Sequence, residues 1–347
     1  MASVVYNQAA LIASDAGEPD TARAMCHQHA AAYLQAAPLT GRAAIRALEP
    51  AVNLARLHIR AGQAHEGHQL LLTLFDAVST DSPTHVEDIS IPAGLTKTAE
   101  DRHEVRAWLW SVLLADGTRA LTSAGRWAEA LAHAEMHHGV GQRMLDGRQV
   151  AVLAALTSGN TLHASSLLAH TVPGESWEKA VTHCLTVLCQ RISGRPWRRA
   201  LQDLVAAYLE RLDPDGMAVF NTRLGLTALE LIDSAEDPAA RLVAAELHRR
   251  TMKTADGYAA RETLAHPLFT ALATDREAED CYALLRDCAL EAGELPGELS
   301  AQLAAALRMS DRTIRRSLAT RSGITRTKQS DLEQKVSQLT ARPRSAL

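Results

Sequence analysis

Hydrophobic and polar residues follow one another along this chain mainly with the period of an α-helix. Apolar residues recur three or four positions apart through nearly the whole sequence. Short Gly, Pro or Asp signals separate these segments, such as "SAGR" near Gly125 and "VPGES" at Val172–Ser176. No segment shows the alternating, β-branched pattern that is typical of strands bounded by hairpin turns. The pattern predicts an all-α protein with about fifteen helices of ordinary length.

One long segment departs from this pattern, "STDSPTHVEDISIPAGLTKTAED" at about 79–101. Loops of that length are uncommon in compact domains and are often functional or disordered. Within it, "HVEDISIP" is suited to a short extended piece. Two interpretations remain open here, a partly ordered insertion and a loop that covers a ligand.

Four of the predicted turns share a second pattern, a Gly followed five residues later by a small residue. The pairs are Gly17 and Ala22, Gly62 and Gly67, Gly125 and Ala130, and Gly159 and Ala164. The stretches "ALTSAGRWAEALAHAEMHH" and "VLAALTSGNTLHASSLLAH" superpose with a separation of 34 residues. A small residue in the second helix of a pair lets the two helices approach closely.

These turns and small residues resemble the tetratricopeptide repeat family over about residues 1–170, with a weaker echo at Leu229–Arg250. The resemblance implies a right-handed α-solenoid of degenerate helical hairpins, which we place at 1–296 with the irregular insertion inside it. Solenoids of this kind offer a concave binding surface. We therefore expect a protein, peptide or small effector to bind there.

Composition supports a soluble helical protein. Hydrophobic residues make up 47% and charged residues 22%, and the apolar content is mostly Ala, Leu and Val, of which Ala and Leu favour helices. The sequence has neither a run of about 18 apolar residues nor the pattern of a secretory signal, so we expect no membrane partner. Five cysteines without a Cys-x-x-Cys pair indicate reduced thiols in a cytoplasm, and the Ala/Arg/Leu bias suits a bacterium.

The net charge of −4 hides an asymmetry along the chain. Residues 301–347 hold ten Lys or Arg and three acids, a net charge of +7, which leaves −11 on the preceding 300 residues. A basic C-terminal segment on an acidic body is associated with nucleic-acid contact.

Candidate enzymatic and metal chemistry is weak in this sequence. Among fifteen histidines, His133 and His137 stand one helical turn apart, but Glu135 lies on another helix face and no third ligand follows. No Gly-x-Ser-x-Gly, P-loop or dinucleotide-binding glycine pattern is present. We therefore expect no catalytic site, no metal and no cofactor, although a helical enzyme with a dispersed site is a third alternative.

The segment "LAAALRMSDRTIRRSLA" at Leu303–Ala319 carries the most specific signal. We predict a helix at about 299–307, a turn at 308–310 and a second helix at about 311–319, with Ser310 as its N-cap. The predicted buried framework consists of Leu303, Ala304, Leu307, Met309, Ile314 and Leu318. This is the spacing of a helix-turn-helix, whose second helix enters a major groove.

The phrase "LRMSDRTIRRSL" resembles the helix-turn-helix of AraC-type bacterial regulators, over about residues 299–325. The resemblance implies that 297–347 is a basic DNA-binding segment of a transcription regulator. Because one such unit is too small a platform for DNA binding, we expect a homodimer that binds two half-sites. By position, the residues expected at the DNA are Ser310, Asp311, Arg312, Arg315, Arg316, Arg321, Arg326 and Lys328. The alternative is a scaffold or adaptor without DNA affinity, whose C-terminal helices cap the solenoid.

Overall fold

The protein is predominantly helical, as the sequence pattern predicts. The computed structural model describes residues 1–212, 216–288, 290 and 292–340, and their side chains up to residue 320. Within the described residues the chain divides into two compact units. The first contains 1–14, 18–113 and 294–347, and the second contains 15–17 and 114–293. The sequence had led us to expect one body at 1–296 and a separate segment at 297–347.

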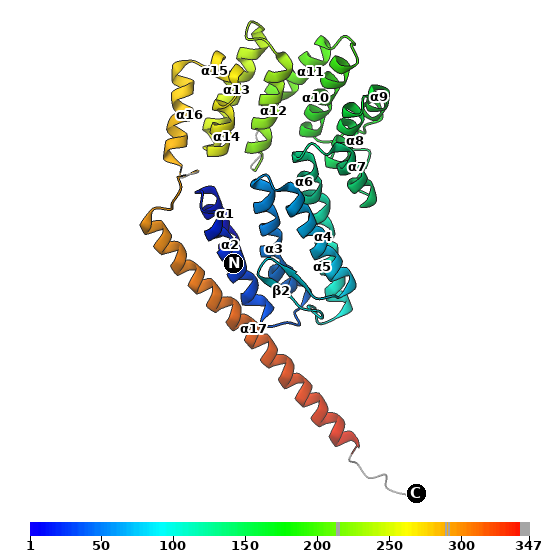
Figure 1. The fold of residues 1–347 in the computed structure, drawn as a ribbon, viewed down its shortest axis with the longest axis vertical. Helices are drawn as coiled ribbons and strands as arrows, with labels where there is room; N and C mark the ends of the chain where they lie inside the picture. Colours follow the sequence, from blue (N-terminus) through cyan, green and yellow to red (C-terminus); the bar gives the residue numbers. More distant parts are fainter. Residues whose placement is uncertain (213–215, 289, 291, 341–347) are drawn as a thin grey trace. The chain divides into compact units, whose positions relative to one another are not determined.

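The first unit contains five helices, a short hairpin and the long C-terminal helix (Figure 1). Its elements are α1 (Ala2–Asp15), α2 (Pro19–Leu34), α3 (Gly41–Arg60), α4 (Ala64–Thr80), β1 (Thr84–Val86), β2 (Ile89–Ile91), α5 (Ala99–Val112) and α17 (Gly297–Thr340). α2, α3, α4 and α5 pack mainly on their neighbours in sequence, and α17 packs on α2. Their buried apolar residues form one continuous core that includes Leu48, Leu54, Leu307 and Ile314.

The second unit is a succession of helices that begins in a π-helical segment, η1 (Leu113–Gly117). Its helices are α6 (Thr118–Ser123), α7 (Trp127–Met136), α8 (Asp146–Thr157), α9 (Thr161–Ala169), α10 (Ser176–Ile192), α11 (Arg198–Leu209), α12 (Ala218–Ile232), α13 (Pro238–Thr254), α14 (Gly257–Leu264), α15 (Pro267–Leu272) and α16 (Asp275–Asp287). Most of these helices also pack on the helix before and the helix after them.

The predicted glycines lie in turns between consecutive helices. Gly62, between α3 and α4, has φ +80°, a conformation that residues with a Cβ rarely adopt. Five residues later, a Cβ on Gly67 would lie 2.6 Å from Ile59 Cγ1 and 2.7 Å from the carbonyl oxygen of Ala55. The corresponding Ala22, Ala130 and Ala164 are fully buried. Gly67 therefore stands where α4 approaches α3 too closely for a side chain, and the corresponding alanines are buried.

The irregular insertion is an ordered hairpin followed by a loop. β1 and β2 pair antiparallel, with Thr84 opposite Ile91 and Val86 opposite Ile89. Val86, Ile89 and Ile91 are buried in the core of the first unit, which fixes the hairpin on the helices. At its tip, Glu87 accepts hydrogen bonds from Arg23, His27 and His58 of α2 and α3. The hairpin is thus an ordered part of the first unit.

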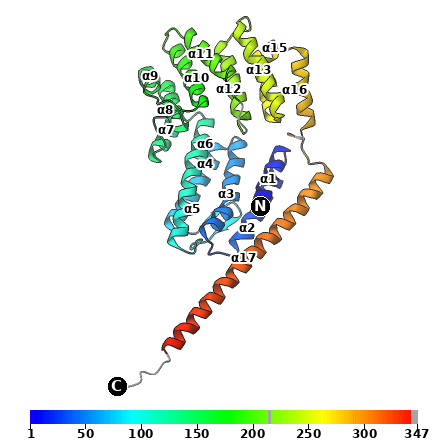
Figure 2. The same cartoon turned by 180° about the vertical axis from the view of Figure 1, so that it is seen from behind.

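The C-terminal region differs most from the prediction, because α17 is continuous through residues 308–310. The expected turn between two helices is absent. Positions 303, 307, 310, 314 and 318 follow the period of a single helix. The helix α17 runs beside α2 and packs on it (Figures 1 and 2). Residues 308–310 contain neither Gly nor Pro, so nothing in the backbone interrupts the helix there. Met309, predicted to be buried, is 69% exposed.

Candidate functional site

A groove of about 600 Å³ lies between α2 and the first half of α17. Its wall on α2 is made of small or uncharged residues, and its wall on α17 is rich in arginine. The lining residues are Tyr6, Thr21, Ala24, Met25, Gln28, Ala31, Ala304, Leu307, Arg308, Asp311, Arg312 and Arg315. The groove is therefore an open hollow with most of its charge on one side.

Apolar contacts position α17 beside this groove. Leu307 and Ile314 are 8% and 3% exposed, and Leu303 and Leu318 pack against the same core. The segment before α17 is also fixed, because the backbone N–H of Leu295 donates to Glu18 Oε1 at 2.8 Å. This hydrogen bond, with a smaller contribution from Thr21, lowers the pKa of Glu18. The rotation of α17 about its axis is thus determined by its apolar stripe.

Arg315 is held in place at one end of the groove. Its Nε donates to Asp311 Oδ2 at 2.8 Å, one helical turn earlier, and a terminal nitrogen donates to Gln35, the residue directly after α2. The hydrogen bond to Asp311 raises the pKa of the Arg315 guanidinium. Asp311 is thereby engaged by a neighbour on its own helix.

Arg308 and Arg312 differ from Arg315, because neither has a hydrogen-bond or ion-pair partner among the described residues. Both are exposed, and they stand one helical turn apart on the flank that lines the groove. Arg316, four residues after Arg312, is also exposed but does not line the groove. Three arginines and one acid line the groove, so it carries an excess positive charge and suits an anionic ligand.

The structure brings together only part of the predicted DNA-facing set. Arg312 and Arg316 are exposed as predicted. Ser310, predicted to face DNA, is only 6% exposed, because it lies in the stripe that packs on the body of the unit. The side chains of Arg321, Arg326 and Lys328 lie outside the described residues.

Sequence reasoning missed Arg308 and the α2 wall of the groove. Arg308 was placed in a turn, whereas it begins the series 308, 312, 316 on one helix face. That series of i, i+4 arginines was visible in the sequence and is the signal that would have found it. Thr21 and Gln28 carry no comparable signal, because only the packing of α17 on α2 brings them to the groove.

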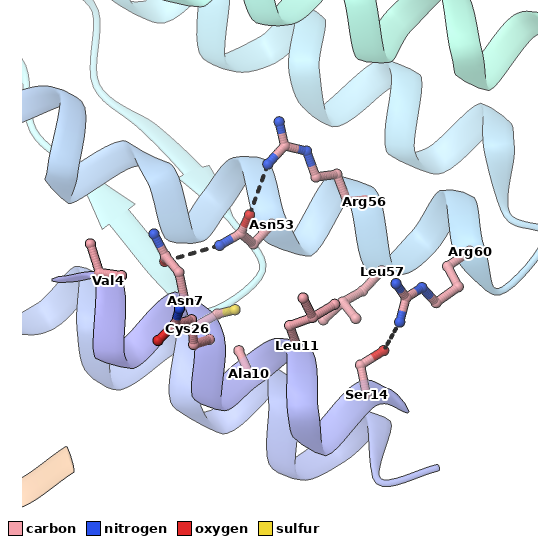
Figure 3. A pocket seen from close by; sticks show the side chains of 11 residues that line it. Val4, Asn7, Ala10, Leu11, Ser14, Cys26, Asn53, Arg56, Leu57 and Arg60 are labelled. Carbon is pink, nitrogen blue, oxygen red and sulfur yellow. Dashed lines mark hydrogen bonds between the residues drawn. The ribbon is translucent and has the colours of Figure 1, made fainter. Parts of the chain in front are cut away.

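A second cavity, of about 360 Å³, lies between α1 and α3, with Cys26 of α2 at its base (Figure 3). Asn53 donates to Asn7 Oδ1 at 3.1 Å and accepts from Arg56 at 3.2 Å, while Arg60 donates to Ser14 at 2.9 Å. Burial, with a smaller contribution from Glu87, raises the pKa of the Cys26 thiol to about 12. The thiol is therefore protonated at neutral pH.

His133 and His137, one helical turn apart in the sequence, also lie close together in the structure. His133 is 6% exposed, and its ring lies edge-on to that of His137 with the ring centroids 4.7 Å apart. Within the described part of the chain, no three His, Cys, Asp or Glu side chains gather as metal ligands would.

None of the described helices is both long enough and apolar enough to cross a bilayer.

Searches among protein families, curated proteins and solved structures each return no match to this chain. The arginine groove beside α17 is therefore identified as a candidate site by its own geometry and charge.

Proposed function

We propose that this protein is a DNA-binding transcription regulator that contacts the phosphate backbone through the arginine flank of α17. The observation that carries the proposal is the pair Arg308 and Arg312, exposed and without described partners beside a groove. Arginine donates in a fork that matches the oxygens of a phosphate. The proposal needs no turn at 308–310, because a continuous basic helix also fits a DNA major groove.

In this proposal the remaining helices form a solenoid similar to tetratricopeptide repeats. The glycine turns and the small residues at close helix contacts support that comparison. A protein, peptide or small effector would bind the solenoid and change how α17 meets DNA. A homodimer would supply two such helices, since one short basic helix gives few contacts to a DNA site.

A second candidate function is a scaffold or adaptor without DNA affinity. The observation that favours it is the packing of Leu307 and Ile314 into the core of the first unit. This packing is what a capping helix requires, because the last helix of an array must cover the apolar face of its neighbour. In that case Arg308 and Arg312 are solvated surface residues.

Binding of the full-length protein to pooled genomic DNA fragments across a salt series separates the two candidates. A regulator enriches discrete fragments, and its affinity falls as salt rises because bound counterions are released. The variant Arg308→Ala/Arg312→Ala removes two phosphate contacts. We expect the slope of log affinity against log salt to fall by about 2, and affinity to drop about 10- to 30-fold.

The matched control is Arg106→Ala/Arg276→Ala. It makes the same change in net charge at two exposed arginines of α5 and α16 that also lack described partners. Affinity equal to that of the unmodified protein is expected for this control. An equal loss of affinity in both double variants would show that DNA binding depends only on the overall charge of the protein. Absence of DNA binding by the unmodified protein would rule out the regulator and leave the adaptor as the remaining candidate function.

A further inference from the structure

A second arginine-lined hollow lies on the other flank of α17. It has a volume of about 140 Å³ and lies between α3 and α17, next to Ile314, Ser317 and Leu318. Its basic residues are Arg42 and Arg46, which stand one helical turn apart near the start of α3. Neither side chain has a hydrogen-bond or ion-pair partner among the residues that the structure describes.

The two arginine pairs therefore lie on opposite sides of one helix. Leu307 and Asp311 face the groove on the α2 side, whereas Ile314 and Ser317 face the hollow on the α3 side. The exposed crest of α17 between them carries Met309, which is 69% exposed, and Arg316. Basic groups therefore border the crest on both sides, from α17 itself on one side and from α3 on the other.

This arrangement matches the cross-section of a DNA major groove. The groove is about 12 Å wide, admits an α-helix, and has the phosphates of one strand on each side. If the crest of α17 enters such a groove, Arg308 and Arg312 meet one strand and Arg42 and Arg46 meet the other. A single nucleic-acid strand would place its phosphates beside only one of the two arginine pairs.

We propose that Arg42 and Arg46 of α3 form a second phosphate-binding site and that the ligand of α17 is double-stranded DNA, held by both strands. The inference rests on the proposed function, since it concerns the same helix and the same ligand class. It adds two residues from an element far away in sequence, and it assigns the ligand as a duplex. Double-stranded RNA fits less well, because its major groove is too narrow for a helix.

The test compares the full-length protein with three variants, Arg42→Ala/Arg46→Ala, Arg308→Ala/Arg312→Ala and the control Arg106→Ala/Arg276→Ala. Each is titrated with a fluorescent DNA duplex of about 20 base pairs, with one of its strands alone, and with the matching RNA duplex. We expect Arg42→Ala/Arg46→Ala to weaken duplex DNA binding about 10-fold, to lower the salt slope by about 2, and to leave single-strand binding unchanged.

A charge-conserving variant separates binding from folding. Arg42→Lys/Arg46→Lys keeps both positive charges and should retain the salt slope of the unmodified protein on duplex DNA. If the Lys variant also loses duplex binding while its thermal unfolding midpoint is unchanged, Arg42 and Arg46 do not act as phosphate-binding cations.

The remaining outcomes are distinct. Duplex binding that depends on Arg308 and Arg312 but not on Arg42 and Arg46 overturns this inference and leaves the proposed function standing. If both arginine variants lose affinity equally for single-stranded and double-stranded DNA, both arginine pairs contact the same strand. If the protein binds the RNA duplex more tightly than the DNA duplex, α17 does not bind in a DNA major groove. Absence of binding to all three probes ends the proposed function itself.

Discussion

Replacing Met309 by proline tests whether α17 is continuous. The side chain of Met309 is 69% exposed, so it contributes little by packing. Its backbone lies inside the helix, and Thr313 Oγ1 donates to its carbonyl oxygen at 2.8 Å. A proline here removes the N–H that bonds to the carbonyl of Ala305 and places its ring against that carbonyl. The expected cost is about 3 kcal/mol.

The proline should lower the free energy of unfolding of the first unit, because Ile314 and Leu318 follow position 309 in α17 and pack on the core of that unit. Hydrogen exchange of the amides at 310–320 and urea unfolding followed by circular dichroism both report it. The control Met309→Ala keeps the N–H and should cost less than about 0.5 kcal/mol. In a helix-turn-helix, residue 309 would lie just after the end of the first helix, where proline is common. Equal stability of the two variants would therefore refute the continuous helix.

Three further predictions concern buried groups. Burial lowers the pKa of His29 from 6.5 to about 4, so stability present above pH 6.5 falls as pH drops towards 4, by up to roughly 3 kcal/mol; urea unfolding of His29→Phe should lack this change. Gly67→Ala should cost about 1–3 kcal/mol, whereas Gly141→Ala, with open space at its Cβ, should leave the thermal midpoint nearly unchanged. Burial opposes ionisation of Glu277, but hydrogen bonds led by that from Arg241 lower its pKa to about 2. The ionised carboxylate of Glu277 stabilises the fold above about pH 4.5, and this contribution is lost as the pH falls. The free energies of unfolding of Glu277→Gln and the unmodified protein should therefore differ less at about pH 2.5 than at neutral pH.

Local signals predicted the helices and their turns well. Gly62 and Gly67 were identified because a left-handed turn and a close helix contact each exclude most side chains, whatever the rest of the fold. The hairpin was foreseen only as an extended piece, although Val86, Ile89 and Ile91 supply the apolar residues that bury it. Local structure can therefore be predicted from the sequence where the conformation of a single residue determines it.

The C-terminal segment was predicted less well, because its apolar residues fit two structures. Leu303, Leu307, Ile314 and Leu318 suit both a straight helix and two helices that meet at a corner. Ser310 favoured the corner as an N-cap, yet its burial against the body of the unit follows from tertiary packing. Arg42 and Arg46 could not be associated with α17 at all, since about 270 residues separate them from it.

The assignment of α17 to the same unit as α1–α5 has a consequence for the order of folding. During synthesis the chain emerges from its N-terminus, so α2 is made long before the helix that covers it. The apolar face that receives Leu307 and Ile314 stays open while residues 114–293 are produced. A nascent or truncated chain that stops before α17 therefore exposes a surface on which chaperones or other chains can bind, and this surface is covered only when α17 has been made.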